Sequence, residues 1–369
     1  MKRIFDSLLL VCFGVAIGVL ICEAGLRVFG YPGSDERTGF HLSSAYGDVA
    51  ADSWIFEAQP RNDELVVNKE RVAITKRAGT MRVLVMGDSG TFGVGVGLEN
   101  SFPSQLRTLA SEKHLDVEVV NAGVVGMSTA NEYMLYRDRL RQLKPDWIVI
   151  GFFMANDINF NLQHFPDLQG HLTVGDQIWR FTRANSSVAH FVDLSKRRFD
   201  ERLGQALAGQ NLALNEGSLV DEDGFSFLNY TLGEIALYRE RPSRLAMNAF
   251  SATNEILSSF KALADSDGAR FAIVLIPTSS RIVNRLLIPD SPRASESLTW
   301  ANLTEDDLDF SIPTERILET CRKMGTTCID PTDSFRKAGY EETMLPGDDH
   351  PSTRGHEILA RSLSTALKF

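Results

Sequence analysis

Short, mainly apolar segments recur along the chain and predict the strands of a sheet. They are rich in β-branched and aromatic residues and end at glycine, proline or polar residues; their ranges are 81–86, 117–120, 147–153, 270–276 and 328–330. Because these runs are mainly apolar and do not alternate with polar residues, the pattern predicts a parallel sheet that is covered on both faces. Helical patterns at 101–111, 130–143 and 353–368 alternate with the strands and supply the covering layers. The sequence therefore predicts an α/β fold.

Three stretches do not follow this alternation. Residues 158–243 carry helical pieces separated by polar loops, of which 188–207 is the clearest, and we expect a mainly helical insertion after the third strand. Residues 277–313 are expected to form a long loop on the same side of the sheet. Before the first strand, residues 65–67 and 72–74 predict short edge strands or a hairpin.

The amino end has the pattern of a membrane anchor. Lys2 and Arg3 are followed by residues 8–22 without a charged residue, and the apolar stretch extends over 7–29, long enough to span a bilayer. An uncleaved signal anchor is favoured over a removed signal peptide, because the residues near the end of the run make a weak cleavage site. In either case the basic amino end stays in the cytoplasm and the rest of the chain is exported, to the periplasm or the cell exterior.

These patterns predict three parts of the chain. Residues 1–30 are the anchor, a transmembrane helix, and residues 31–79 are a tether with an N-terminal extension. Residues 80–369 form the main domain, with the insertion at about 158–243 inside it. The protein is expected to contact the membrane through its N-terminal helix.

Composition excludes several classes of protein. The net charge of −10 in 369 residues argues against a nucleic-acid partner, which requires a basic surface. The four cysteines and seven histidines show no zinc-ligand spacing, and neither a metal nor a cofactor is expected. Cys321 and Cys328 are close enough in sequence to form a disulfide in an exported domain, although two buried thiols fit the sequence equally well.

Polar residues at the ends of successive strands suggest a catalytic site. Ser89 follows the first strand, and ligands of open α/β sheets bind beyond the carboxyl ends of the strands. A serine nucleophile needs a base, which His350 can supply, and Asp348 can orient that imidazole. The attack creates an oxyanion, for which the backbone N–H groups of Ser89 and Gly126 and the side-chain amide of Asn156 are candidate donors.

Four ordered blocks carry a resemblance to a known family: Gly-Asp-Ser at 87–89, Asn-Ala-Gly-Val-Val-Gly at 121–126, Asn-Asp at 156–157 and His-Pro at 350–351. With these blocks, the chain from about residue 81 to its carboxyl end resembles the SGNH (GDSL-type) hydrolases, the insertion excepted. The resemblance implies a three-layer α/β/α sandwich around a five-stranded, mostly parallel, flavodoxin-like sheet. It also implies that Ser89 is the nucleophile, His350 the base, and Gly126 and Asn156 donors to the oxyanion.

The sequence departs from the family pattern at three positions. Gly90 replaces the leucine of the first block, and Met154 replaces the glycine of the third. Gly347 occupies the position, three residues before the histidine, at which the family usually has its carboxylate. Asp348 is therefore assigned to orient His350, with Asp349 as the alternative.

The predicted function is a membrane-tethered serine esterase that acts on acylated small molecules, lipids, glycolipids or polysaccharides of the cell envelope. Transfer of the acyl group to a sugar hydroxyl would use the same residues, and a non-catalytic envelope scaffold is a further alternative. A phosphate-binding module is disfavoured, because the glycines after the first strand lack the G-x-G-x-x-G spacing and Asp88 adds negative charge there. His356, in the last helix, is expected to be structural.

Overall fold

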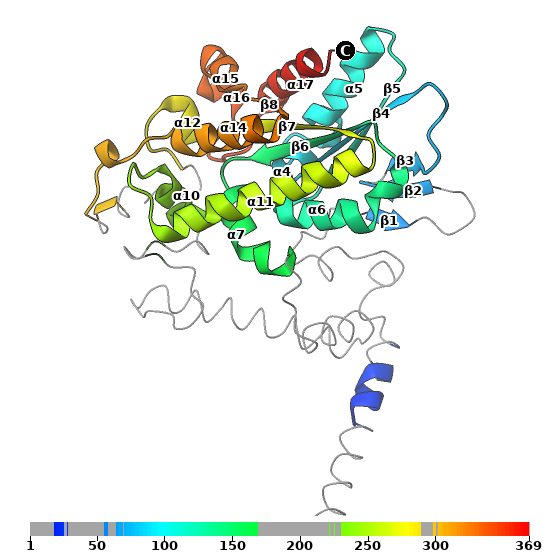
Figure 1. The fold of residues 1–369 in the computed structure, drawn as a ribbon, viewed down its shortest axis with the longest axis horizontal. Coiled ribbons are helices and arrows are strands. Elements are labelled where there is room, and N and C mark those ends of the chain that lie inside the picture. The colour runs from blue at the N-terminus through cyan, green and yellow to red at the C-terminus, as the bar shows by residue number, and fades with distance from the viewer. Residues whose placement is uncertain are drawn as a thin grey trace, which may run out of the picture. The chain divides into compact units, whose positions relative to one another are not determined.

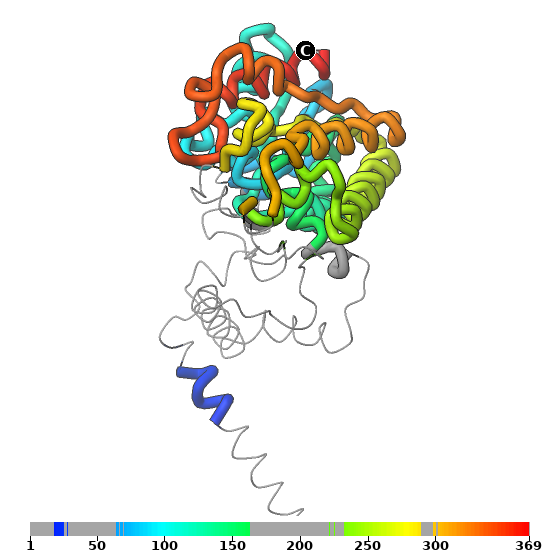
Figure 2. Tube along the Cα trace, turned by 90° about the vertical axis from the view of Figure 1, so that its left-hand side faces the viewer, coloured from blue at the N-terminus to red at the C-terminus, as the bar shows by residue number. Residues whose placement is uncertain are grey.

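The computed structural model of the protein describes residues 18–25, 28, 55–57, 64–68, 70–168, 221, 225, 230–288, 298–299 and 302–368 (Figures 1 and 2). The chain divides into two compact units. One comprises Met1–Ala45 and Leu172–Glu216, and the other comprises Tyr46–His171 and Gly217–Phe369. The second unit contains every strand described below and all the candidate site residues.

The described part of the first unit is one short helical segment. Residues 18–25 are helical, and the side chains of Val19, Leu20 and Ile21 are exposed. No helix within the described ranges has both the length and the apolar character that crossing a membrane requires. Most of the predicted span at 7–29 and the whole predicted helix at 188–207 lie outside the described residues.

A five-stranded parallel sheet forms the centre of the second unit. Its strands, in spatial order, are β5 (Val117–Gly123), β4 (Met81–Gly87), β6 (Trp147–Phe153), β7 (Arg270–Ile276) and β8 (Thr327–Ile329). Each neighbouring pair is parallel. This is the flavodoxin-like order, in which the first strand lies between the second and the third. The predicted parallel sheet is confirmed, and the five strands predicted for it all belong to it.

Helices cover both faces of this sheet, as its apolar strands require. The helix α5 (Phe102–Glu112) packs on β5 and on the last helix, α17 (Thr353–Leu367). On the other side, α11 (Arg244–Ser266) contacts β7, α6 (Thr129–Asp138) and α14 (Ile312–Met324). Figure 1 shows α5 and α17 above the sheet and α6 and α11 below it. The central strand β6 is buried along its whole length.

The remaining elements of this unit are short or lie in the connections. They are α4 (Ser89–Phe92), η1 (Leu98–Asn100), η2 (Leu140–Leu143), α7 (Asp157–Leu168), α10 (Tyr230–Tyr238), α12 (Ser279–Val283), η3 (Glu305–Asp307), α15 (Thr332–Ala338) and α16 (Tyr340–Thr343). Of these, α7 and α10 are the described helices of the predicted insertion at 158–243.

A small antiparallel sheet precedes the main one. It consists of β1 (Ile55–Glu57), β2 (Glu64–Val67) and β3 (Glu70–Ala73). The connection between β2 and β3 is a two-residue turn, because Val67 pairs with Glu70. The expected hairpin is confirmed, and its strand β2 lies against β5 at the edge of the main sheet.

The structure corrects two of the expected elements. The long loop predicted at 277–313 contains α12 and η3, and α14 begins at Ile312. Thr278 starts α12 because its side chain accepts a hydrogen bond from the N–H of Arg281, and threonine at this position is a helix-capping signal. The helix predicted at 130–143 is interrupted after Asp138, and its last turn is the 3₁₀ helix η2.

A disulfide joins Cys321, in α14, to Cys328, in β8. The two Cα atoms are 6.0 Å apart, a separation typical of disulfides. Of the two readings that the sequence left open for these cysteines, the structure shows the bonded one.

Candidate active site

The candidate nucleophile lies at the junction of β4 and α4. The strand ends at Gly87, and Asp88 caps the helix, its carboxylate accepting a hydrogen bond from the N–H of Gly90 at 2.9 Å. Ser89 is the first residue of α4 and is buried except for 8 % of its surface. The sequence therefore places the serine in a sharp turn between a buried strand and a short helix.

Glycines in three neighbouring strands give α4 the room to pack against the sheet. Gly87, Gly123 and Gly151 lie opposite one another in neighbouring strands. A Cβ atom on Gly87 or Gly151 would overlap the Thr91 side chain, and one on Gly123 would lie 2.5 Å from the backbone nitrogen of Phe92. Glycine at these positions therefore allows α4, which begins with Ser89, to approach the sheet closely.

Ser89, His350 and Asp348 form a hydrogen-bonded relay. The Oγ atom of Ser89 is 2.8 Å from Nε2 of His350, and Nδ1 of His350 is 2.5 Å from Oδ1 of Asp348. A carboxylate beside Nδ1 holds the proton on that nitrogen, which leaves the lone pair of Nε2 to accept the serine proton. The ring of Phe153 packs against the imidazole, with the centroids 5.4 Å apart. The predicted base and its predicted acid are both brought to the serine.

A proline–glycine turn explains why the acid lies two residues before the histidine. The N–H of Asp348 donates to the carbonyl of Leu345, and Gly347 has a φ of 71°. Proline at the second position and glycine at the third are the signature of a type II turn, whose third residue needs a positive φ. Gly347 is thus required by the backbone, and the carboxylate is supplied by the next residue, Asp348.

The alternative acid, Asp349, has a different role. Its carboxylate accepts hydrogen bonds from both the N–H and the hydroxyl of Ser279, at the start of α12. Its exposed fraction is 1 %, whereas the Asp348 side chain is 35 % exposed beside the imidazole. Of the two aspartates, Asp348 is therefore the one that contacts the imidazole, and Asp349 anchors this loop.

Asn156 is held beside the nucleophile by Asp88. Its Nδ2 atom donates to Oδ2 of Asp88 at 2.9 Å, and the Ser89 hydroxyl is 3.4 Å from the same oxygen. One amide N–H of Asn156 is therefore fixed, and the second remains available for an oxyanion that forms at Ser89. Burial is the largest influence on Asp88 and raises the pKa of its carboxyl, against the hydrogen bonds from Asn156 and Gly90. Sequence reasoning gave Asp88 no role in catalysis.

Gly126 lies in a tight turn just after β5. The N–H of Met127 donates to the carbonyl of Val124, and Gly126, the third residue of the turn, has a φ of 81°. This is again the position at which a type II turn favours glycine. Because Gly123 ends β5 directly opposite Gly87, the turn lies at the same sheet edge as Ser89.

Asp157, the second residue of the Asn-Asp block, ties the site to its surroundings. Its carboxylate accepts from the N–H of Phe153 at 2.7 Å, and from the N–H of Thr129 at 3.1 Å. It thereby joins the end of β6 to the start of α6. Burial raises the pKa of Asp157 well above its usual value, and burial does the same for Glu132, with Asp157 and Asp88 adding to the effect.

Asn121 is a further residue whose role the sequence did not reveal. Its side-chain oxygen accepts from the N–H of Gly123, and its Nδ2 atom donates to the carbonyl of Thr91 and to the hydroxyl of Ser101. Asn121 therefore fastens β5 to α4 and to the start of α5. Its place in the 121–126 block could have drawn attention to it.

His356 is structural, as expected, and the structure shows how. Its Nδ1 atom accepts a hydrogen bond from the N–H of Phe102 at 3.1 Å, which provides the cap that Ser101 does not give to α5. Burial lowers the pKa of His356 to about 3, and the ring is neutral at physiological pH. His41, His171 and His190 lie outside the described residues.

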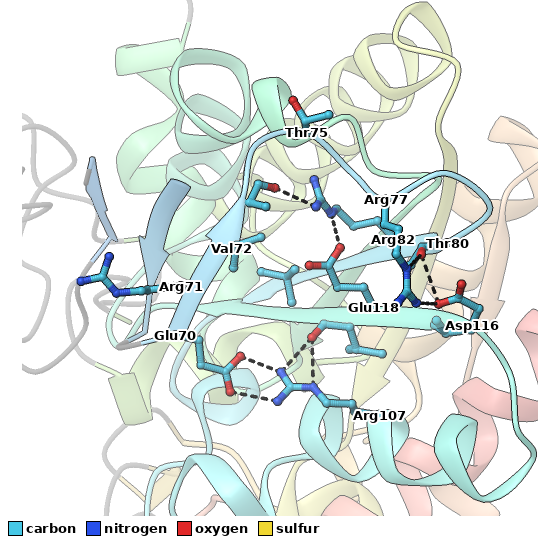
Figure 3. Close-up of a pocket in the computed structure, with 14 residues that line it drawn as sticks. Glu70, Arg71, Val72, Thr75, Arg77, Thr80, Arg82, Arg107, Asp116 and Glu118 are labelled. Atoms are coloured by element: carbon cyan, nitrogen blue, oxygen red, sulfur yellow. Dashed lines mark hydrogen bonds and ion pairs between the residues drawn. The ribbon is translucent and has the colours of Figure 1, made fainter. Parts of the chain in front are cut away.

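The described residues contain no cluster of three or more His, Cys, Asp or Glu side chains that could hold a metal ion. A pocket of about 550 Å³ lies elsewhere, beside β3 and β5, and none of the candidate site residues lines it (Figure 3). Its arginines are engaged by acids: Arg107 pairs with Glu70, and Arg82 with Glu118. This pocket is therefore an ionic groove remote from the candidate active site.

Comparisons with known proteins identify similar folds at low identity. No protein-family model matches the chain, and no curated protein matches its sequence. TesA is 14 % identical with a TM-score of 0.41, the match covering 78 % of this chain and 98 % of TesA. Axe2, an acetylxylan esterase from Geobacillus stearothermophilus, is 12 % identical with a TM-score of 0.41, covering 80 % and 97 % of the two chains.

LAE5, an alpha/beta hydrolase from the metagenome of Lake Arreo, is 11 % identical with a TM-score of 0.40, covering 79 % of this chain and 97 % of LAE5. At such TM-scores the likeness carries no argument about activity.

Proposed function

We propose that the protein is a serine esterase that cleaves acyl esters through an acyl-Ser89 intermediate. The observation that carries the proposal is the relay in which Ser89 Oγ lies 2.8 Å from His350 Nε2 and Asp348 lies 2.5 Å from Nδ1 of the same ring. Serine is a weak nucleophile unless an adjacent base removes its proton, and an oriented imidazole is the usual base. The three residues supply both requirements.

The first half of the reaction forms the acyl-enzyme. His350 Nε2 takes the hydroxyl proton as Ser89 Oγ attacks the ester carbonyl carbon, and Asp348 stabilises the resulting imidazolium. The carbonyl oxygen becomes an oxyanion and accepts hydrogen bonds from the free amide N–H of Asn156 and from the backbone N–H groups of Gly126 and Ser89. The tetrahedral intermediate then expels the alcohol, which leaves with the proton from His350.

The second half removes the acyl group. Water gives a proton to His350 and attacks the acyl carbon, the same donors stabilise the second oxyanion, and Ser89 regains its proton as the carboxylic acid leaves. Since the buried amide of Asn156 is already held by Asp88, the site is organised before a substrate arrives.

A fluorophosphonate probe tests the proposal. The probe phosphonylates an activated serine, and we expect the wild-type protein to be labelled at Ser89, while Ser89→Ala stays unlabelled and His350→Ala reacts far more slowly. Peptide mapping of the adduct identifies the serine. A wild-type protein that resists the probe, or a Ser89→Ala variant that is labelled equally, would contradict the esterase proposal.

Whether water or a sugar hydroxyl resolves the acyl-enzyme decides between hydrolysis and acyl transfer. The proposed substrates are acyl esters of cell-envelope polysaccharides, glycolipids or lipids. Incubation of the protein with an acetyl donor and a polysaccharide acceptor separates the two reactions. Free acetate as the main product supports the esterase, and acetyl groups on the sugar support the transferase.

We also propose that the protein is anchored in the membrane with its catalytic unit exported. The basic amino end, the apolar run at 7–29 and the Cys321–Cys328 disulfide support this location, because disulfides persist in oxidising compartments. Fractionation followed by protease treatment of spheroplasts tests it. We expect a full-length protein in the membrane fraction that is degraded from outside, whereas a protein protected until lysis would contradict export.

A further inference from the structure

The free edge of β5 is covered by side chains. In a parallel strand, alternate residues direct their backbone groups to the same side, and the carbonyls of Val119, Asn121 and Gly123 point away from β4. Arg107 donates to the carbonyl of Val119 at 2.8 Å, and Asn68 donates to the other two. Figure 3 shows the Arg107 guanidinium between the carboxylate of Glu70 and this strand.

Asn68 occupies the tip of the hairpin between β2 and β3. Its Nδ2 atom donates at 2.9 Å to the carbonyl of Asn121 and at 2.8 Å to that of Gly123, and these two bonds use both amide hydrogens. The residue is 2 % exposed and has a φ of 47°, a conformation that asparagine tolerates better than most residues. Among the described residues its Oδ1 atom has no hydrogen-bond partner, and the side chain therefore acts as a donor.

The two carbonyls that Asn68 binds lie just before the turn that contains Gly126, a proposed donor to the oxyanion. Gly123 is the last residue of β5, and the turn that contains Gly126 begins at the next residue. Asn121, whose carbonyl Asn68 also binds, holds the nucleophile helix through its bond to Thr91. The buried side-chain amide of Asn68 thus fixes the end of β5. The turn with Gly126 follows this strand end, and Asn121 in the strand holds α4.

We propose that Asn68 is a positioning residue, which holds the end of β5 so that the Gly126 N–H points at the oxyanion. The inference rests on the proposed esterase function, because it concerns the donors of that reaction. It makes the hairpin a part of the catalytic machinery, although Asn68 touches neither the substrate nor Ser89. Arg107 covers the same strand edge at Val119, further from the turn, and has no such role.

The test uses the full-length protein with p-nitrophenyl acetate as the probe ester. Asn68→Gly removes the amide and keeps the turn, because glycine adopts a positive φ without strain. Since complete loss of one oxyanion donor costs about 10²–10³ in turnover, we expect a displaced donor to lower kcat about tenfold. KM and the pH profile are expected to remain those of the wild type, because the Ser89–His350–Asp348 relay is untouched.

Two further variants separate positioning from simple loss of stability. Asn68→Asp keeps the size of the side chain and the turn, but a carboxylate cannot donate to two carbonyls, and we expect the same loss of kcat. Arg107→Met uncovers Val119 instead, and it should lower the unfolding temperature while leaving kcat within about twofold of the wild type. Equal losses of kcat in Arg107→Met, or a wild-type kcat in Asn68→Gly, would overturn the inference.

Hydrogen exchange gives a readout that does not depend on activity. We expect the amides of residues 124–127 to exchange faster in Asn68→Gly and to remain protected in Arg107→Met. Unchanged exchange in Asn68→Gly would refute the positioning role. If the wild-type protein neither hydrolyses the ester nor reacts with the fluorophosphonate, the proposed function fails, and the exchange data still decide whether Asn68 holds the turn.

Discussion

Asp348 and Asp349 are adjacent in the chain, yet their side chains bind different partners. The type II turn ends at Asp348 and directs its carboxylate to Nδ1 of His350, while the next carboxylate turns inward to Ser279. Two adjacent aspartates can therefore bind different partners because the backbone directs their side chains in different directions. The sequence contains the Pro-Gly signal for this turn, whereas the contact of Asp349 with Ser279 depends on the fold.

Asp348→Asn tests this assignment. An asparagine cannot stabilise the imidazolium and can hold the imidazole in the wrong tautomer, and we expect kcat to fall by about 10²–10⁴-fold with the protein still folded. Asp349→Asn is the matched control, in which we expect a lower unfolding temperature and a much smaller loss of kcat. Steady-state kinetics with p-nitrophenyl acetate measures both, and the reverse ranking would refute the assignment.

His356 illustrates how burial can turn an ionisable residue into a neutral cap. Its folded-state pKa of about 3 lies below the usual histidine value of 6.5, because burial opposes the charged form. Between these values the unfolded chain binds a proton that the folded chain does not, and stability falls as the pH falls. Above pH 6.5 the group is neutral in both states and contributes no pH dependence.

His356→Asn removes this titration and keeps an acceptor near the N–H of Phe102. We expect the variant to be less stable than the wild type at pH 8, because it packs less well. Between pH 6.5 and pH 4 its stability should fall less steeply, by up to about 1.4 kcal/mol per pH unit. Urea unfolding at several pH values measures the difference, and parallel curves would contradict the inferred role of protonation.

At the scale of elements, the position of the short helix α4 depends on two residues of the neighbouring strand β5. Gly123 allows the backbone of Phe92 to approach β5, and Asn121 fastens the same helix by its bond to Thr91. A helix of four residues has too few internal hydrogen bonds to be stable alone. Its position is therefore set by the sheet on which it lies.

Gly123→Ala tests this dependence. The new methyl group would meet the backbone of α4, which cannot move aside as a flexible side chain can, and helix and strand must separate. We expect kcat to fall at least tenfold, since a displacement of about 1 Å near the reacting atoms can cost 10²-fold. Gly79→Ala is a control outside the site: nothing lies within 4 Å of the new methyl group, and its φ of 85° should lower stability by backbone strain while kcat is kept. Equal losses in both variants would contradict the packing argument.

The sequence predicted the elements that have strong local signals. The five strands, the hairpin and the closing helix were visible as apolar runs and periodic patterns, and the four blocks located Ser89, Gly126, Asn156 and His350. The contacts of Asp88, Asn121 and Asn68 could not be predicted in this way. Each is a polar side chain that binds backbone or amide groups distant in sequence, and such pairing depends on the fold as a whole.

For the whole molecule, the division into two compact units predicts which residues can be removed while the unit that contains the sheets still folds. Leu172–Glu216 groups with the amino-terminal residues, and the flanking segments group with the sheets. The three predicted parts of the chain at 1–30, 31–79 and 80–369 remain a prediction. Within that scheme, the insertion is the segment expected to shape substrate preference.

Replacing residues 172–216 by a flexible Gly/Ser linker tests the division. Because the sheets and the relay lie in the other unit, we expect the shortened protein to unfold cooperatively and to hydrolyse p-nitrophenyl acetate at a rate close to that of the wild type. Activity on larger envelope esters should change more. Loss of folding, or equal losses on small and large esters, would contradict the division.

The covered edge of β5 has a consequence for the behaviour of the protein among its own copies. An edge strand with free carbonyls can recruit a strand from another chain, which is a common route to aggregation and fibrils. Here the carbonyls of Val119, Asn121 and Gly123 are already bound by Arg107 and Asn68, and the strand at the opposite edge, β8, has only three residues. The side chains of Arg107 and Asn68, which cover this sheet edge, should therefore also prevent β5 from pairing with a strand of another copy of the protein.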